Sequence, residues 1–367
     1  MNKVIPDEIV TPEIMIDIDV LDRNIERMAA SMRTRGLKLR PHAKTHKTLE
    51  IASKQLAAGA VGLTVATIGE AEVFAEGGAS DIFIAYPLWV DTHHADRLHQ
   101  LATVATIAVG IDSVEGATAM GRSLGADAGS INVLIEVDSG HHRSGVLPGD
   151  ASLVARAAAN SGLTVTGVFT FPGHSYKPGM PMGAAHDENR ALTQAAAELA
   201  SAGFDVKEIS GGSTPTALLE GETVATELRP GVYVFGDAQQ LELERCTWNE
   251  IALTVATTVV SRHEAHSGNL RRIVVDAGSK ILGSDRPGWA TGYGRLPDFP
   301  DARITALSEH HATVEWPENA DLPTPGQRLR VIPNHVCLAM NLVDQVTVVQ
   351  NGSVVDRWAV AARGRNN

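Results

Sequence analysis

Runs of consecutive apolar, often β-branched residues alternate along the first two thirds of the chain with helix-like segments rich in alanine, leucine and glutamate. The apolar runs predict eight strands, at 37–42, 62–65, 81–85, 106–111, 132–137, 166–171, 208–211 and 227–229. Helices are predicted between them, for example at 48–58, 69–76, 151–161 and 184–201. Apolar strands joined by helical crossovers are typical of a parallel sheet covered on both faces. Eight of them predict an α/β fold built on a (β/α)8 TIM-type barrel, with a doubly wound sheet as the alternative.

The pattern changes after about residue 240. Segments rich in threonine and valine, separated by Gly, Pro and Asn turns, predict strands at 251–260, 271–275, 304–307, 313–316, 328–332 and 345–349. Residues 14–18 also alternate as a strand does. We therefore predict a strand within residues 1–18 that joins a β domain at 243–367, and a barrel at 19–242 between them.

Composition and charge narrow the class of protein. The chain has 367 residues, of which 44% are hydrophobic, and a formal net charge of −12. The negative charge and the lack of a basic run argue against nucleic-acid binding. Two distant cysteines suggest no disulfide framework. The first residues lack the apolar run of a signal peptide, and no stretch is long enough to span a membrane. We expect a cytoplasmic protein.

The segment Leu37–Lys47 contains the first predicted strand and the residues just after it. It carries four cationic or titratable side chains. Arg40, His42, Lys44 and His46 would share one face if the strand continued through them. Neighbouring cations lower the pKa of a lysine toward its reactive amine form, so Lys44 is a candidate Schiff-base lysine. The alternative is a surface strand end with scattered basic residues. Lys280 is a weaker candidate, because it lies outside the predicted barrel.

Barrel enzymes place their sites at the C-terminal ends of the strands. Small residues at 210–216 follow the seventh strand and residues 229–233 follow the eighth, where barrels usually bind phosphate. An ordinary polar turn is the alternative. Arg143, His174 and Tyr176 follow the fifth and sixth strands. The planar fork of an arginine suits a carboxylate or an aromatic oxygen, whereas the other two are more often structural residues.

His335 and Cys337 stand two residues apart in the predicted β domain. On a strand they would share a face and could chelate one soft divalent ion, since zinc takes nitrogen and sulfur ligands. Two ligands would leave positions open for water or substrate. The alternative is a buried cysteine beside an unrelated histidine.

These motifs together resemble the D-threonine aldolase / D-serine dehydratase family, the metal-activated branch of the alanine-racemase-like pyridoxal-phosphate (PLP) enzymes. The resemblance runs nearly end to end. The motifs that carry it lie at 11–25, 40–47, 173–176, 227–233, 276–280 and 333–337. It implies the alanine-racemase-like architecture, with PLP attached to Lys44 and a divalent metal (zinc, manganese or magnesium) on His335 and Cys337. It also implies a small D-amino acid as substrate and a head-to-tail homodimer.

Two groups of residues at the barrel follow from the resemblance and from the positions above. The candidate catalytic residues are Lys44, His42, Arg143, His174 and Tyr176. The candidate cofactor-binding residues are Lys44, Tyr176, Gly211, Gly212, Ser213, Thr214, Arg229, Gly231, Val232 and Tyr233. Arg229 matches the position where the racemase-like enzymes bring an arginine to the pyridine nitrogen.

The resemblance implies a lyase that acts on D-β-hydroxy amino acids. The motif set favours a D-threonine aldolase type, which cleaves the substrate to glycine and an aldehyde. A D-serine dehydratase type, which gives a 2-oxo acid and ammonia, is the alternative, and the histidine–cysteine pair is closer to that type. A PLP-dependent racemase, a PLP homeostasis protein and a cofactor-free phosphate-sugar barrel enzyme are further alternatives. The homeostasis proteins typically lack a β domain, which this sequence predicts.

Overall fold

The computed structural model describes residues 5–265 and 271–367, so the first four residues of the predicted segment 1–18 lie outside the described residues. The chain divides into two compact units. The barrel unit comprises residues 27–44, 49–231 and 364–367, and the β unit comprises residues 1–26, 45–48 and 232–363. This division changes unit at 231/232, whereas the sequence predicts a boundary at 242/243.

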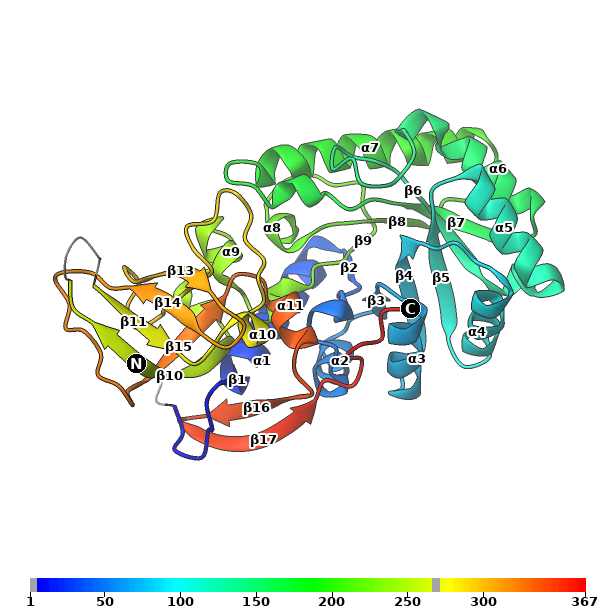
Figure 1. The fold of residues 1–367 in the computed structure, drawn as a ribbon. Coiled ribbons are helices and arrows are strands. Elements are labelled where there is room, and N and C mark those ends of the chain that lie inside the picture. Colours follow the sequence, from blue (N-terminus) through cyan, green and yellow to red (C-terminus); the bar gives the residue numbers. More distant parts are fainter. Residues whose placement is uncertain (1–4, 266–270) are drawn as a thin grey trace. The chain divides into compact units, whose positions relative to one another are not determined.

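The barrel unit contains a parallel sheet of eight strands in the order β2-β9-β8-β7-β6-β5-β4-β3 (Figure 1). Their bounds are β2 Lys38–Leu39, β3 Leu63–Val65, β4 Asp81–Pro87, β5 Thr106–Ile111, β6 Asn132–Glu136, β7 Thr164–Phe169, β8 Glu208–Gly211 and β9 Glu227–Leu228. The two end strands also meet, because Val61 N donates to Leu39 O and Thr64 N donates to Pro41 O, at 2.9 and 2.8 Å. These bonds close the sheet into the predicted barrel.

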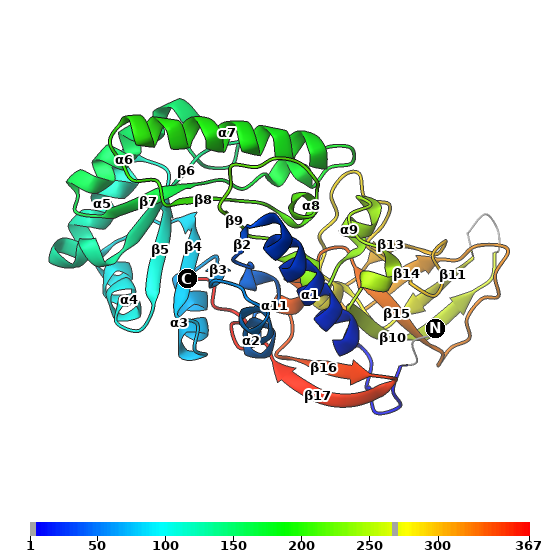
Figure 2. The ribbon, with the colours of Figure 1, turned by 180° about the vertical axis from the view of Figure 1, so that it is seen from behind.

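Helices cover the outer face of this sheet, as Figures 1 and 2 show from opposite sides. They are α2 Leu49–Ala57, α3 Ile68–Glu76, α4 Thr92–Ala102, α5 Val114–Leu124, α6 Ala151–Asn160 and α7 Pro181–Ser201, and the short α8 Thr214–Ala217 follows β8. Polar side chains fix several helix starts. Thr67, Asp91 and Ser113 each accept a hydrogen bond from an amide in the first turn of α3, α4 and α5.

The barrel interior contains an apolar cluster below the strand ends. Phe83, Ala108, Leu134 and Phe169 form one buried cluster, in which the two phenylalanine rings meet edge to face at 5.0 Å. These residues come from neighbouring strands, as the alternation of side chains in a barrel requires. The polar groups at the C-terminal rim therefore lie on a packed apolar cluster.

The β unit contains a nine-stranded sheet. The main path runs β13-β14-β11-β10-β1-β16-β17, and β12 and β15 join it through β10. The strands are β1 Glu13–Asp17, β10 Leu253–His263, β11 Arg272–Val275, β12 Gly294–Arg295, β13 Arg303–Leu307, β14 Ala312–Glu315, β15 Arg328–Pro333, β16 Gln345–Gln350 and β17 Ser353–Ala359. The predicted N-terminal strand is β1, which pairs with β10 and β16. The sequence patterns missed β17 and the two-residue β12.

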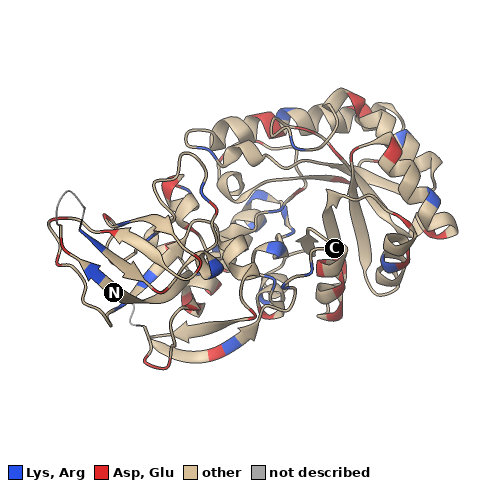
Figure 3. Cartoon of the chain, in the orientation of Figure 1, with Lys and Arg blue, Asp and Glu red and all other residues tan. Residues whose placement is uncertain are grey.

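The remaining α-helices among the described residues are one long helix and three short ones. The long helix α1 spans Ile18–Arg35, and α9 Ala238–Glu242, α10 Ser279–Leu282 and α11 Val336–Asn341 belong to the β unit. Within residues 5–265 and 271–367, no helix is both long and apolar enough to span a membrane. Basic and acidic residues are scattered over the elements of both units (Figure 3).

Candidate active site

The aromatic ring of Phe171 is the common contact of the candidate residues at the C-terminal rim of the barrel. The Lys44 Nζ atom lies 5.9 Å from the ring centroid and the Arg143 guanidinium carbon lies 5.2 Å from it. The His141 ring meets Phe171 edge to face at 5.6 Å, and the Tyr176 ring lies at 6.2 Å. Loops after three different strands therefore converge on one ring. Two cations over an aromatic face are a favourable arrangement.

The local structure around Lys44 differs from the extended strand that the sequence predicts. β2 is only two residues long, and Lys44 lies in the 3-10 turn η1 (Ala43–Thr45). Because a 3-10 turn has three residues per turn, side chains two apart no longer share a face. The prediction of one cationic face through Arg40, His42, Lys44 and His46 is therefore wrong. His42 still borders the rim, since its amide donates to Pro230 O at 3.0 Å.

Arg40 points to the strand starts instead of the site. Its Nε atom lies 2.8 Å from Glu227 and its Nη1 atom lies 2.6 Å from Asp81, and each carboxylate belongs to the first residue of its strand. Although burial would lower the pKa of Arg40, these carboxylates raise it. Arg40 is thus a buried ion-pair partner that ties β2 to β9 and β4.

Glu136 is a rim residue that the sequence analysis did not select. It ends β6, is 3% exposed, and accepts a hydrogen bond from Ser144 Oγ at 2.9 Å on Oε1. Its Oε2 atom is buried, and no described group hydrogen-bonds to it. Burial raises the pKa of Glu136, and the Ser144 hydrogen bond and the nearby Arg143 oppose this rise. A buried carboxyl with an open oxygen is a ready partner for a bound polar ligand.

His174 lies in the 3-10 turn η4 (Gly173–Ser175) after β7 and is 8% exposed. Neither ring nitrogen makes a hydrogen bond within the described residues. Its Nε2 atom is 3.4 Å from the Asp187 carboxylate of α7, which also pairs with Arg190 at 2.6 Å. A β-carbon on Gly140 would come within 3.3 Å of the ring. Packing therefore restricts the ring, and Nδ1 is a buried polar atom without a hydrogen-bond partner among the described residues.

The glycine loop, defined as residues 211–214, is held from behind by Glu188 of α7. Gly212 N donates to Glu188 Oε1 at 2.5 Å, and a β-carbon on Gly211 would lie 2.3 Å from the same oxygen. Ser213 N donates to Thr216 Oγ1 at 3.0 Å, and Ser213 Oγ lies 2.9 Å from Ser175 Oγ. Two of the amides expected to bind phosphate therefore already have acceptors within the barrel unit.

Arg229 is buried below the rim and fully engaged with barrel groups. Its Nε atom donates to Ser210 Oγ at 2.8 Å and its Nη2 atom donates to Thr170 O at 2.5 Å. The guanidinium lies over the rings of Phe83 and Phe169, at 5.5 and 5.3 Å from their centroids. Burial lowers the pKa of Arg229. Its proximity to the cofactor ring nitrogen stays a prediction.

The remaining predicted cofactor residues follow β9. Arg229 N donates to Gly211 O at 2.9 Å, so the chain leading to Gly231 adjoins the glycine loop. Val232 and Tyr233 lie in the 3-10 turn η5 (Val232–Val234) and belong to the β unit. Their expected role in binding phosphate stays a prediction.

The predicted metal pair lies at the start of helix α11, and not on a strand. His335 is the residue before this helix, with extended backbone angles, and Cys337 lies in its first turn. The two side chains nevertheless interact. Cys337 Sγ is 3.4 Å from Thr45 Oγ1, and His335 Nδ1 is 3.4 Å from Asp237 Oδ2. Burial alone would lower the pKa of His335, but Cys337 and Asp237 raise it well above its usual value.

The donor set fits a divalent ion with an incomplete protein shell. One imidazole and one thiol in contact suit zinc, which binds nitrogen and sulfur. Among the described residues, no group of three or more His, Cys, Asp or Glu has the geometry of a metal site. Water or substrate would therefore supply the remaining ligands. Neither cysteine forms a disulfide in the described part of the chain.

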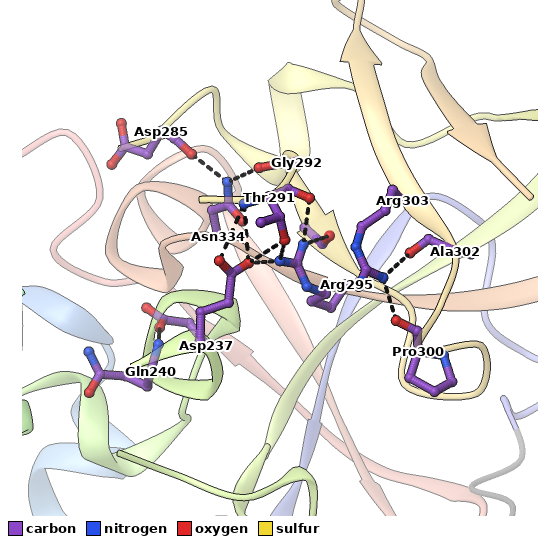
Figure 4. A network of polar contacts seen from close by, with 12 residues as sticks. Asp237, Gln240, Asp285, Thr291, Gly292, Arg295, Pro300, Ala302, Arg303 and Asn334 are labelled. Atoms are coloured by element: carbon purple, nitrogen blue, oxygen red, sulfur yellow. Dashed lines mark hydrogen bonds and ion pairs between the residues drawn. The ribbon is translucent and has the colours of Figure 1, made fainter. Parts of the chain in front are cut away.

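The turn that carries the pair is braced by Asn334. Its Nδ2 atom donates to Asp285 O at 2.9 Å and to Gly292 O at 2.8 Å (Figure 4). Arg295 stands nearby and donates through Nη1 to Gly294 O at 2.8 Å. Because its brace comes from two other loops of the β unit, the backbone before His335 is held in place without any metal.

Four residues that shape this end of the barrel were not among the candidates selected from the sequence: Glu136, Phe171, Asp187 and Glu188. The first two end or follow strands, so the rule about strand ends could have found them. The other two are charged residues of helix α7, where a sequence pattern predicts exposure. Only their tertiary contacts show what they do.

Two family descriptions match the chain. Residues 16–239 match the alanine racemase N-terminal domain, and residues 252–349 match a putative serine dehydratase domain. The chain is 36% identical to the D-threo-3-hydroxyaspartate dehydratase of Delftia sp. HT23, a match that covers 89% of this chain and 90% of that enzyme. It is 32% identical to the D-threonine aldolase of Arthrobacter sp., with 96% and 93% covered.

Solved structures agree with these matches. The Delftia dehydratase superposes with a TM-score of 0.87 at 32% identity, covering 96% of this chain and 97% of that one. The D-threonine aldolase of Filomicrobium marinum gives a TM-score of 0.84 at 29% identity, with 99% of each chain covered. In two variants of the dehydratase, alanine replaces a histidine or a cysteine two positions later, and the cysteine variant is described as a metal-free form.

Proposed function

Because this chain belongs to the alanine-racemase-like family that includes D-threo-3-hydroxyaspartate dehydratase and D-threonine aldolase, we propose that it is a PLP- and metal-dependent lyase of D-β-hydroxy amino acids. The observation that carries this proposal is the convergence of Lys44, Arg143 and Tyr176 on the Phe171 ring at the barrel rim. His174 Nδ1 and Glu136 Oε2 support it, because buried polar atoms that lack a hydrogen-bond partner among the described residues are candidates for binding a polar ligand.

Each rim residue has a chemical task in this proposal. PLP, when bound at Lys44, supplies the electron sink for the electrons released when a bond to the substrate Cα breaks. Lys44 Nζ is the candidate base for the proton at Cα. The exposed Arg143 guanidinium can bind the substrate carboxylate with its two parallel N–H groups. His174 is the candidate group for proton transfer at the β-hydroxyl: it would donate a proton to the leaving oxygen in a dehydratase and accept the hydroxyl proton in an aldolase.

A divalent metal has a separate task, which is to polarise the β-hydroxyl as a Lewis acid. His335 and Cys337 would hold it. We propose the dehydratase course as the reaction: the substrate loses its α-proton and its β-hydroxide, together one water, and the resulting 2-imino acid is hydrolysed by water to a 2-oxo acid and ammonia. Support comes from the histidine–cysteine pair, because the Delftia dehydratase variants show the same residue types at the same spacing.

The aldolase course predicted from the motif set is the second candidate. Its support is the end-to-end similarity to the Arthrobacter D-threonine aldolase. In that course a base takes the β-hydroxyl proton and the Cα–Cβ bond breaks, which gives glycine and an aldehyde. The rim residues would serve both courses, so the products decide between them.

The deciding experiment is product analysis. Purified protein loaded with PLP is incubated with D-threonine, D-serine and D-threo-3-hydroxyaspartate, with and without a chelator. A 2-oxo acid with ammonia supports the dehydratase, and glycine with an aldehyde supports the aldolase. Turnover of all three at the same rate in chelator would refute the metal role.

The cofactor lysine is tested separately by borohydride reduction and peptide mass analysis. PLP should label the peptide that contains Lys44, and the label should be lost in Lys44→Ala. Lys280→Ala is the matched control, because Lys280 is an exposed lysine paired with Glu309 at 3.0 Å in the β unit. A label that persists in Lys44→Ala would refute the assignment.

A further inference from the structure

Asp237 is a fully buried carboxylate with two different tasks for its two oxygens. It precedes helix α9 and is 0% exposed. Its Oδ1 atom accepts a hydrogen bond from Gln240 N at 2.8 Å, which caps the helix. Its Oδ2 atom lies 3.4 Å from His335 Nδ1 and 3.4 Å from Val336 N.

Capping alone does not explain a buried aspartate at this position. Asparagine caps a helix as well as aspartate does, and it carries no charge that must be removed from water. The second oxygen faces the backbone and ring at the start of α11, about a hundred residues further along the chain. Asp237 therefore connects the helix it caps to the turn that carries the metal pair.

The contact selects one nitrogen of His335. His335 Nδ1 faces the Asp237 carboxylate at 3.4 Å without a formed hydrogen bond, and Nε2 is the nitrogen left for a metal. The ring also contacts the Cys337 side chain. A carboxylate behind a metal-binding histidine fixes the tautomer and the orientation of the ring, and it makes the imidazole a stronger ligand.

We propose that Asp237 is a positioning residue of the metal site, which holds His335 so that its Nε2 atom and the Cys337 sulfur bind one divalent ion. This inference rests on the proposed function, because it takes the metal pair from there. It goes further in naming a third residue on which metal affinity depends, although that residue does not touch the metal. Removal of such a carboxylate typically costs roughly 10- to 100-fold in metal affinity.

The test is a metal titration that needs no enzymatic turnover. Protein freed of metal by a chelator is titrated with Zn²⁺ in competition with a chromophoric chelator, and with Co²⁺ while its visible absorption is recorded. The variants are Asp237→Asn and Asp237→Ser, both of which keep a side chain that caps a helix. Asp91→Asn is the matched control, because Asp91 caps α4 of the barrel unit through His94 N at 3.0 Å.

We expect both Asp237 variants to bind Zn²⁺ about 10- to 100-fold more weakly than the wild type, with unchanged circular dichroism. The Co²⁺ spectrum should weaken or change shape, and Asp91→Asn should bind like the wild type. If either folded Asp237 variant binds Zn²⁺ as tightly as the wild type, Asp237 only caps α9 and the inference is overturned.

Failure of the proposed metal site gives a different result. The variant His335→Ala, which lacks one proposed metal ligand, is titrated in the same way to detect that failure. A wild type that binds Zn²⁺ no better than His335→Ala would remove the metal pair itself, and the positioning role with it. Loss of affinity in His335→Ala without loss in the Asp237 variants would remove the positioning role alone.

Discussion

The buried carboxyl of Glu188 offers a quantitative test of the barrel structure. Glu188 is 6% exposed on α7, and Gly212 N donates to its Oε1 atom at 2.5 Å. Burial raises its pKa from 4.5 to about 7, although the Gly212 hydrogen bond and the charge of Arg229 act against the rise. Substitution Glu188→Gln keeps the shape and a carbonyl acceptor for Gly212 N but removes the titration.

The sign of the effect follows from proton binding. Because the folded chain holds the Glu188 proton more tightly than the unfolded chain, this group stabilises the fold fully below about pH 4.5, and the contribution is lost as the pH rises to about 7. Each unit of pKa difference corresponds to 1.36 kcal/mol, so the difference between 4.5 and about 7 gives about 3 kcal/mol. Relative to the wild type, Glu188→Gln should therefore gain about 3 kcal/mol of unfolding free energy between pH 4.5 and pH 7.5.

The assay is urea unfolding of the PLP-free protein at half-unit steps from pH 4.5 to 8, followed by far-ultraviolet circular dichroism. Glu198→Gln is the control, since Glu198 is a half-buried residue on the same helix. Its pH profile is the baseline against which the Glu188→Gln profile is compared. If the difference between Glu188→Gln and the wild type is flat across this range, the Glu188 carboxyl is ionised in the folded barrel and the reasoning fails.

Three further substitutions test other contacts of the barrel. Arg40→Ala leaves two carboxylates at the strand starts without their cation and should destabilise the fold by roughly 3–5 kcal/mol in urea unfolding, whereas an effect below 1 kcal/mol would mean that the ion pairs are well hydrated. Phe171→Leu removes the ring that faces Lys44 and a neighbouring arginine. The two lost cation–ring contacts, of roughly 0.5–1 kcal/mol each, should together raise the KM for the amino acid substrate by about tenfold. An unchanged KM would mean that Phe171 is not part of the site. Asp187→Asn should lower kcat by at least about tenfold with KM retained, if the carboxylate orients His174 as a base, and an unchanged kcat would contradict that role.

Several barrel strands could be predicted closely because they are largely apolar runs bounded by polar residues. β5 and β8 have the predicted bounds, β4 and β6 differ by two residues and one residue at their C-terminal ends, and β7 begins and ends two residues earlier than predicted. β2 is the exception, since the predicted strand 37–42 contains only Lys38 and Leu39 in strand geometry. Pro41 interrupts it, because proline has no amide hydrogen for the ladder. Lys44 keeps its place at the rim for another reason, which is the pairing of His42 with Pro230 and Thr64.

The candidate site could be predicted only as far as its residues follow strands. Lys44, Arg143 and His174 come together because parallel strands of a barrel end at one rim, which is a property of the fold class. Residues of helix α7 have no such rule. Asp187 and Glu188 are adjacent in sequence, yet one faces a histidine and the other faces the glycine loop, and only the tertiary packing of α7 decides this.

The glycine loop shows how the same residues can fit a motif for a different reason. Gly211 and Gly212 were interpreted as small residues whose amides surround a phosphate. In the barrel, Gly211 leaves room for the Glu188 carboxyl, and the amide of Gly212 donates to that carboxyl. A phosphate cannot use the Gly212 amide while Glu188 accepts from it. We therefore expect the phosphate of PLP to be bound by hydroxyl groups of this loop and by the amide of Gly231, with Glu188 acting as the support that holds the loop in shape.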